Sequence, residues 1–138
     1  MLFTKECDYS IRILRALSDG ELHNVNYIAK EECISKPITY KLTRLLEIEG
    51  FLKSYRGVQG GYIISKPLDQ VTLFDVGLAI NKSISLNSCL ETEECGKYKD
   101  CKGMQNCAIH NEMGRIQNMI NNELQSKSLA ELFECKAK

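Results

Sequence analysis

The sequence lacks several features that would place it in a common class. No apolar run approaches the roughly 20 residues of a membrane span, which argues against a membrane protein. The formal net charge is zero, from 18 basic and 18 acidic residues, which argues against a globally basic nucleic-acid binder. The chain also shows no nucleophile–base pair, phosphate-binding loop or paired-carboxylate motif. We therefore expect neither an enzyme nor a small-molecule substrate.

A secretory signal is also missing from the first residues, where Met1–Phe3 is followed closely by Lys5, Glu6 and Asp8. We therefore expect a cytoplasmic protein. In that reducing compartment, clustered cysteines more often bind metal or do redox chemistry than form structural disulfides. The chain has 138 residues, of which 43% are hydrophobic and 26% charged, so it fits one domain with a buried core, with or without an appended element.

Cysteine is the residue present in excess, with seven copies. Four of them follow an even stride with five residues between neighbours, namely Cys89, Cys95, Cys101 and Cys107, and His110 comes three residues after the last. Such a cluster of thiols and an imidazole indicates soft-metal ligation. Structural zinc sites favour spacers of about two to four residues, so an iron–sulfur cluster fits this stride better. Zinc and metal-free thiol redox sensing stay open as alternatives.

The other cysteines have ordinary interpretations. We expect Cys7 and Cys33 to be buried packing residues. Cys135 lies in a polar tail and is expected to be a free thiol, and His23 is expected in an exposed loop.

Three helices are predicted in the first 50 residues, at about 4–18, 24–33 and 35–50, with Thr4, Asn24 and Ser35 as caps. The apolar stripe of the third helix consists of Ile38, Leu42, Leu45 and Leu46. Its opposite side carries basic and hydroxyl groups. From residue 36 to residue 66 six basic residues stand against two acidic ones, so the local charge is positive although the chain is neutral.

A β-hairpin is predicted next, with strands at 51–55 and 62–65. The turn between them, residues 56–61, contains three glycines that can take positive φ. Three short helices followed by a hairpin is the order of a winged helix-turn-helix, whose third helix reads the DNA major groove. We therefore expect double-stranded DNA as a partner. The candidate contacts are Ser35, Lys36, Tyr40, Lys41, Arg44, Arg56, Gln59 and Gly60.

The second half of the chain has three predicted parts. Thr72 and Asp75 form a capping-box pattern that starts a fourth helix. Residues 81–107 are predicted to form a cysteine-rich loop, because their apolar residues follow neither a helical nor a strand period. A long helix is predicted over 108–124, and its single apolar stripe suits packing against the same helix of a second subunit in a homodimer.

The predicted fold class is mainly α with a small β-hairpin. We divide the chain into a winged helix-turn-helix domain (1–80), a cysteine-rich loop (81–107), and a dimerisation helix with its tail (108–138).

Three segments together resemble the Rrf2 family of bacterial transcription regulators. They are the hairpin segment Gly50–Tyr62, with its arginine-glycine-x-x-glycine-glycine-tyrosine run, the opening Thr4–Leu17, and Leu73–Ile80 followed by the cysteine loop and the long helix. The resemblance extends over essentially the whole chain. It implies a homodimer in which each subunit has a winged domain and a dimerisation helix.

The resemblance also implies how a cluster would be held. Cluster-binding members use three loop cysteines and one weaker ligand, which is a histidine just after the last cysteine in IscR-like members, where His110 matches. In NsrR-like members it is an aspartate on the first helix of the other subunit, where Asp8 matches. Cys89 matches the first family cysteine and Cys107 the last. This chain has four loop cysteines instead of three, so the middle ligand is Cys95 or Cys101, and a two-iron or four-iron cluster stays open.

A weak fourth ligand suits a sensor because it leaves one iron open to reaction or loss. The sequence therefore predicts a DNA-binding transcriptional regulator, expected to be a repressor, gated by an iron–sulfur cluster that senses redox state, nitric oxide or iron. A zinc-binding or metal-free thiol regulator of the same fold, or a zinc-stabilised protein-interaction module, is the alternative.

Overall fold

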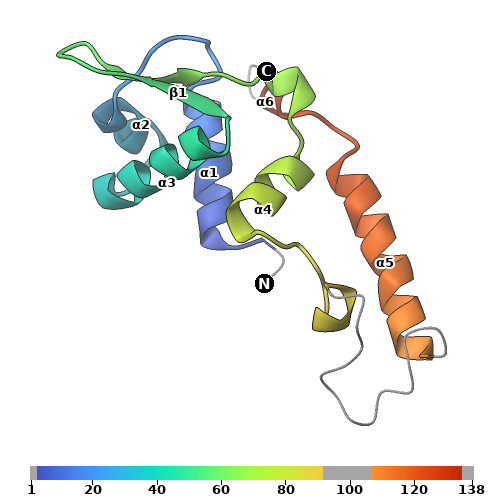
Figure 1. The fold of residues 1–138 in the computed structure, drawn as a ribbon. Helices are drawn as coiled ribbons and strands as arrows, with labels where there is room; N and C mark the ends of the chain where they lie inside the picture. The colour runs from blue at the N-terminus through green and yellow to red at the C-terminus, as the bar shows by residue number, and fades with distance from the viewer. Residues whose placement is uncertain (1–2, 92–106, 135–138) are drawn as a thin grey trace.

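The computed structural model describes residues 3–91 and 107–134, and its elements are drawn in Figure 1. Helices α1 (Lys5–Ala16), α2 (Val25–Glu32) and α3 (Lys36–Ile48) precede an antiparallel hairpin of β1 (Leu52–Tyr55) and β2 (Gly61–Ile64). The remaining elements are η1 (Leu68–Gln70), α4 (Leu73–Asn81), η2 (Ser88–Leu90), α5 (Ala108–Leu124) and α6 (Leu129–Glu134). The predicted fold class, mainly helical with a small hairpin, is confirmed.

Helix α1 is the centre of the packing. Thr4 caps it as predicted, since its side-chain oxygen accepts a hydrogen bond from the Cys7 backbone N–H at 3.3 Å. One face of the helix is fully buried through Ile13 and Leu14, and Leu17 just beyond its end is buried as well. Helices α2, α3 and α4 all pack on α1. The hydrophobic effect thus joins the first four helices into one core.

The predicted buried face of helix α3 is confirmed at Leu42 and Leu46, which are fully buried, but not at its first residue. Its buried residues are Thr39, Leu42, Thr43 and Leu46. The prediction for Ile38 is wrong, because this residue is 36% exposed. Two threonines are buried in its place because their hydroxyls donate to helix carbonyls, Thr39 to Ser35 O at 2.9 Å and Thr43 to Thr39 O at 2.8 Å. Each buried hydroxyl therefore keeps a partner.

The C-terminal residues return to this core. The Thr72–Asp75 capping box of α4 is confirmed, and a second one joins Ser128 and Glu131 at the start of α6. Leu129 of α6 is fully buried, and its backbone N–H donates to Val71 O at 2.7 Å. In the described part of the chain, no helix combines the length and apolar character needed to cross a bilayer.

Helix α5 has the predicted bounds and contacts α4. Figure 1 draws it apart from α1, α2 and α3. Among its residues only Gln117 is buried. The predicted apolar stripe is half-buried at Met113, Ile116, Ile120 and Leu124 and ends in Ile109, which is 70% exposed. The stripe is therefore only partly covered by its own chain.

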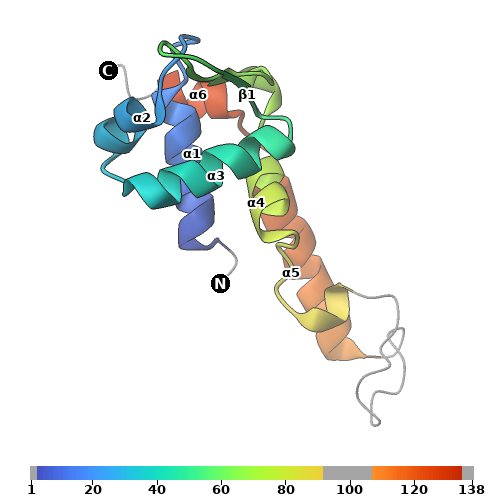
Figure 2. The same ribbon diagram turned by 60° about the vertical axis from the view of Figure 1, so that its left-hand side comes forward.

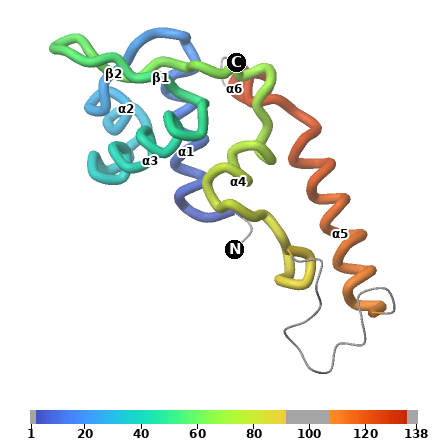
Figure 3. Tube along the Cα trace, in the orientation of Figure 1, coloured from blue at the N-terminus to red at the C-terminus, as the bar shows by residue number. Residues whose placement is uncertain are grey.

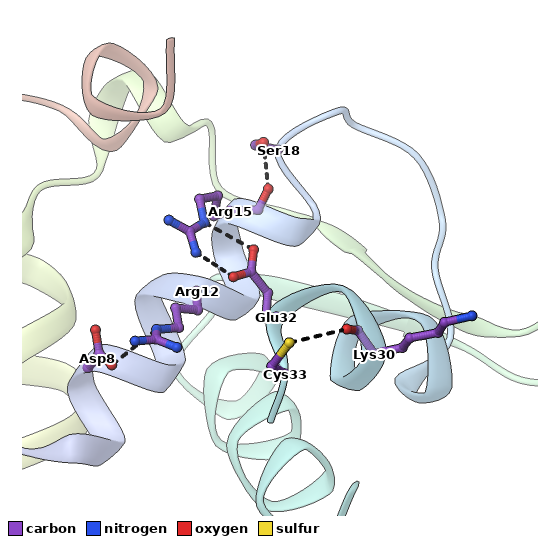
Figure 4. Close-up of polar contacts among 7 residues, drawn as sticks. All are labelled: Asp8, Arg12, Arg15, Ser18, Lys30, Glu32 and Cys33. Carbon is purple, nitrogen blue, oxygen red and sulfur yellow. Dashed lines mark hydrogen bonds and ion pairs between the residues drawn. The ribbon is translucent and has the colours of Figure 1, made fainter. Parts of the chain in front are cut away.

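An ion pair between α1 and α2 sits at the edge of the core (Figure 4). Arg15 donates from Nε to Glu32 Oε1 at 3.0 Å and from a terminal nitrogen to Oε2 at 2.5 Å. The hydrogen bond to Glu32 raises the pKa of Arg15 against the opposing effect of burial. Only 3% of the Glu32 side chain is exposed, against 36% for Arg15. The carboxylate therefore depends on this two-point contact.

Removing Arg15 is expected to destabilise the protein because Glu32 would be left buried without its partner. We expect Arg15→Ala to lower the free energy of unfolding by about 2 kcal/mol, less than for a fully buried pair because Arg15 is partly exposed. The matched control is Arg12→Ala, whose pair with Asp8 is exposed on both sides and should contribute less than about 1 kcal/mol. Denaturant unfolding measures both, and equal losses would contradict this account of Glu32.

Candidate cysteine site and DNA interface

His110 contacts two of the predicted ligand cysteines. Its ring Nδ1 lies 3.4 Å from Cys89 Sγ, and its backbone N–H donates to Cys107 Sγ at 3.4 Å. Cys89 belongs to η2 and Cys107 is the N-cap of α5. Residues from both ends of the cysteine loop therefore meet at the first turn of α5, where Figures 1 and 2 both draw the yellow turn beside the orange helix end.

Gln117 holds the segment that carries Cys89 onto α5. Its side-chain oxygen accepts from the Leu86 backbone N–H at 2.7 Å, and its side-chain nitrogen donates to Ile84 O at 3.1 Å and to Asn121 Oδ1 at 2.8 Å. The residue is 8% exposed, so these contacts satisfy an otherwise costly buried amide. Two turns of helix separate Gln117 from His110. The hydrogen bonds of Gln117 to Leu86 and Ile84 therefore help to keep Cys89 near the first turn of α5.

The donor set fits an iron–sulfur cluster or another soft-metal site. The His110 imidazole lies beside the Cys89 thiol, while the Cys107 thiol contacts only the backbone N–H of His110. Thiols and an imidazole are donors that soft metals accept. Within residues 3–91 and 107–134, however, no group of three or more His, Cys, Asp or Glu side chains could hold a metal ion. Cys95 and Cys101 lie outside the described residues, so a complete site needs donors from that segment.

The remaining candidates lie elsewhere. Asp8 is on α1, where it pairs with Arg12 at 3.1 Å (Figure 4), and its role toward a second subunit stays a prediction. Cys7 is fully buried as predicted. The prediction for Cys33 is wrong, because its side chain is exposed at the left-handed residue that ends α2. Cys135 lies outside the described residues.

The predicted DNA face is exposed and carries free cations. Its residues Ser35, Lys36, Tyr40, Lys41, Arg44, Arg56 and Gln59 are exposed, and Gly60 is half-buried. Among the described residues no carboxylate pairs with Lys36, Arg44 or Arg56. Unpaired cations on one helix and one hairpin tip suit contact with phosphates.

Carboxylates near this face are bound in internal contacts. Glu47 accepts from the Ser54 hydroxyl at 2.5 Å and so ties α3 to β1, and Glu49 pairs with Lys82 beyond α4. Lys41 alone among the predicted cationic contacts is paired, with Glu6 of α1 at 2.5 Å. The acidic groups therefore leave the local positive charge of the face largely intact.

Two glycines set the position of the hairpin. The prediction of positive φ at three glycines is wrong for two of them, since only Gly57 has it, at 113°. A Cβ on Gly60 would lie 2.3 Å from Tyr55 O, and one on Gly61 would lie 2.3 Å from His23 O. These positions need glycine because another backbone segment approaches closely.

His23 is the residue whose backbone lies against Gly61. The prediction that His23 is an exposed loop residue is wrong. Its backbone exchanges hydrogen bonds with Tyr62 at 3.1 and 2.8 Å, and its ring stacks on Tyr27 with centroids 3.9 Å apart. Its Nε2 lies 2.8 Å from Asp19 Oδ2, and the side chain is 18% exposed. Burial pushes the pKa of Asp19 upward, but the hydrogen bonds from His23 and the Glu21 backbone outweigh it and lower the pKa. His23 thus anchors the hairpin beside α2.

Sequence reasoning missed Gln117 and His23. A polar residue inside the apolar stripe of α5, between Met113 and Ile120, was a signal for Gln117. No local pattern marks His23, because its partner Tyr62 lies far along the chain. The hairpin and the cysteine site lie at opposite ends of the trace (Figure 3), so any effect of one on the other must pass through the elements between them.

Comparisons with known proteins place the whole chain beside one group. The family model Rrf2, described as an iron-dependent transcriptional regulator, matches residues 3–135. Protein aau3 of Rhizobium meliloti is 25% identical over 99% of this chain and 87% of its own. The helix-turn-helix-type transcriptional regulator IscR of Photorhabdus laumondii is 28% identical over 76% of this chain and 60% of its own.

A solved structure has the same fold. The global cysteine regulator CymR of B. subtilis superposes with a TM-score of 0.74 at 24% identity, covering 96% of this chain and 95% of that one.

The close contact between Gly61 and the backbone of His23 is expected to contribute to the free energy of unfolding. We expect Gly61→Ala to lower the free energy of unfolding by about 1–3 kcal/mol, because the new Cβ would meet backbone at His23 and force the two segments apart. Val58→Ala is the control, since Val58 at the hairpin tip is fully exposed and its change should stay within about 0.5 kcal/mol. Urea unfolding gives both values, and wild-type stability in Gly61→Ala would show that the approach is not constrained.

Proposed function

Because the chain belongs to the Rrf2 family of transcriptional regulators, we propose that it is a DNA-binding regulator gated by an iron–sulfur cluster. The family match to residues 3–135 makes it a transcriptional regulator and agrees with the prediction that it is not an enzyme. The gating is our inference from the cysteine site. Its expected ligands are Cys89, Cys107, His110 and either Cys95 or Cys101.

One observation carries this proposal, namely the meeting of Cys89, Cys107 and His110. The two thiols are separated by a loop that begins in η2 and ends at α5, yet both contact the same histidine. A cluster held by three thiolates and one imidazole supplies an iron that is easily modified or lost. The chain supplies the thiols, positions His110 as the weaker ligand, and ties the loop ends to η2 and α5.

Operator recognition is assigned to α3 and the hairpin tip. Arg44 and Lys36 project from α3, and Arg56 from the hairpin, without a carboxylate partner among the described residues. Phosphate contacts from such residues fix the orientation of a protein on DNA, while base contacts give specificity. Binding to a duplex operator is the function that this face supports best.

A homodimer completes the proposal. Helix α5 exposes Ile109 and Met119 and leaves most of its apolar stripe half-buried. A second copy of the same helix would cover this stripe and place two α3 helices on one duplex, as two-fold symmetric readers require. Asp8 of one subunit would then be available as an alternative fourth ligand for the site of the other.

The second candidate is a regulator that senses oxidants through its thiols without a cluster. It is favoured by the same two contacts, because Cys89 beside the His110 imidazole and Cys107 at the His110 backbone N–H, with two more cysteines between them in the sequence, also suit reversible disulfide formation. Each disulfide would pass two electrons and two protons to an oxidant of the peroxide class. Iron and sulfide analysis of protein purified without air separates the candidates, because only the first retains both elements.

Cys107 is both the N-cap of α5 and a proposed cluster ligand, and two substitutions distinguish these roles. Serine is a good N-cap, so we expect Cys107→Ser to keep the stability of α5 while removing a ligand. Cys107→Ala should lose the ligand and also about 0.5–1 kcal/mol of stability. Anaerobic visible absorbance and thermal unfolding measure the two effects. Full absorbance in Cys107→Ser would remove Cys107 from the ligand set.

The DNA face is tested by titrating a duplex selected from a random-sequence library. We expect Arg44→Ala and Arg56→Ala each to weaken binding by about 1–3 kcal/mol. If the lost contact is to phosphate, the slope of log affinity against log salt should fall by about one. The control is Arg115→Ala, whose side chain pairs with Glu112 on α5. Unchanged binding in both α3 and hairpin variants would contradict the assigned face.

A further inference from the structure

The segment of residues 82–91 is attached both to the DNA-reading helix and to the cysteine site. At one end Lys82 pairs with Glu49, the C-cap residue that follows α3. In the middle Gln117 of α5 binds the backbone at Ile84 and Leu86. At the other end Cys89 contacts His110.

We propose that Gln117 and the Glu49–Lys82 ion pair are positioning residues that make the DNA affinity of α3 respond to the state of the cysteine site. The proposal rests on the proposed function and names its route. It assigns no contact with DNA or with the cluster to any of these three residues.

The coupling follows from the shared cost of ordering one short segment. Lys82 has a left-handed backbone with φ of 63°, so the chain turns sharply there as it leaves α4. A ligand that binds Cys89 fixes the end of the segment that lies at the cysteine site. Because the segment is then partly ordered, forming the Lys82–Glu49 ion pair at its other end costs less conformational entropy. Loss of the ligand frees the end at the cysteine site and weakens the pair at α3.

The geometry gives Gln117 the larger role. It is buried and supplies both a donor and an acceptor to the segment. A methionine of similar length would fill the space but leave Leu86 N–H and Ile84 O without partners. The Glu49–Lys82 pair is more exposed, with 26% of the glutamate and 67% of the lysine side chain accessible, so its effect should be smaller.

The test compares DNA affinity in two states of each full-length variant. Protein reconstituted with iron and sulfide under argon is titrated with a library-selected duplex, and so is the same protein stripped by a chelator. The ratio of the two dissociation constants measures the coupling. Glu49→Gln should keep the visible spectrum and move this ratio about two- to fivefold toward one. Gln117→Met should bring the ratio close to one and speed iron release to the chelator by roughly tenfold.

Two matched variants show whether the effect is specific. Glu112→Gln removes an exposed ion pair on α5 that does not touch the segment, and Asn122→Met makes a similar change at an exposed position of the same helix. Both should keep the wild-type ratio. Hydrogen exchange of the Leu86 amide should accelerate in Gln117→Met and on stripping the wild type.

The outcomes separate this inference from the function on which it rests. A wild-type ratio of one would remove the proposed gating itself. A wild-type ratio far from one, kept unchanged in both Glu49→Gln and Gln117→Met, would retain the gating and overturn the route through residues 82–91.

Discussion

The docking of residues 84–86 on helix α5 is the constraint on which the cysteine site depends. Without it, Cys89 would be held near His110 only by the contacts of η2 itself with α5. Gln117 makes the docking specific because a buried amide must find a donor and an acceptor, and Leu86 N–H and Ile84 O are those partners. A single polar residue in an apolar stripe therefore helps to hold one end of the site on α5.

The core around α1 imposes the second constraint. It joins α2, α3 and α4 and also receives Leu129 from the far end of the chain. The proposed DNA-binding face is thus built on this packed core, with the hairpin anchored by the His23–Tyr62 pairing. Helix α5 lies outside this core, and the second copy that we propose would cover its half-buried apolar stripe. In the function that we propose, this core binds DNA and the cysteine site outside it receives the signal.

Much of the fold could be predicted from the sequence because its helix ends are marked locally. Thr4, Asn24 and the Thr72–Asp75 box cap the helices they were expected to cap. The bounds of α5 followed from its periodicity. The failures concern tertiary contacts: Ile38 is exposed because Thr39 and Thr43 bury their hydroxyls within the helix, and His23 is partly buried because Tyr62 pairs with it.

The cysteine site divides in the same way. The even stride of thiols pointed to a ligand group, but the sequence could not show that His110 meets Cys89, since that contact requires η2 to lie against the first turn of α5. The role of Gln117 was hidden for the same reason. Local patterns identify which residue types can do the chemistry, and only the packing of α4, η2 and α5 shows which of them meet.

The most direct measurement is the affinity of the wild-type protein for its selected duplex, made anaerobically before and after its iron and sulfide are removed. A protein that carries both elements as purified, and whose affinity changes at least about tenfold on their removal, is the result this account predicts. A protein that is purified without iron and sulfide, or that binds DNA equally well in both states, would contradict it.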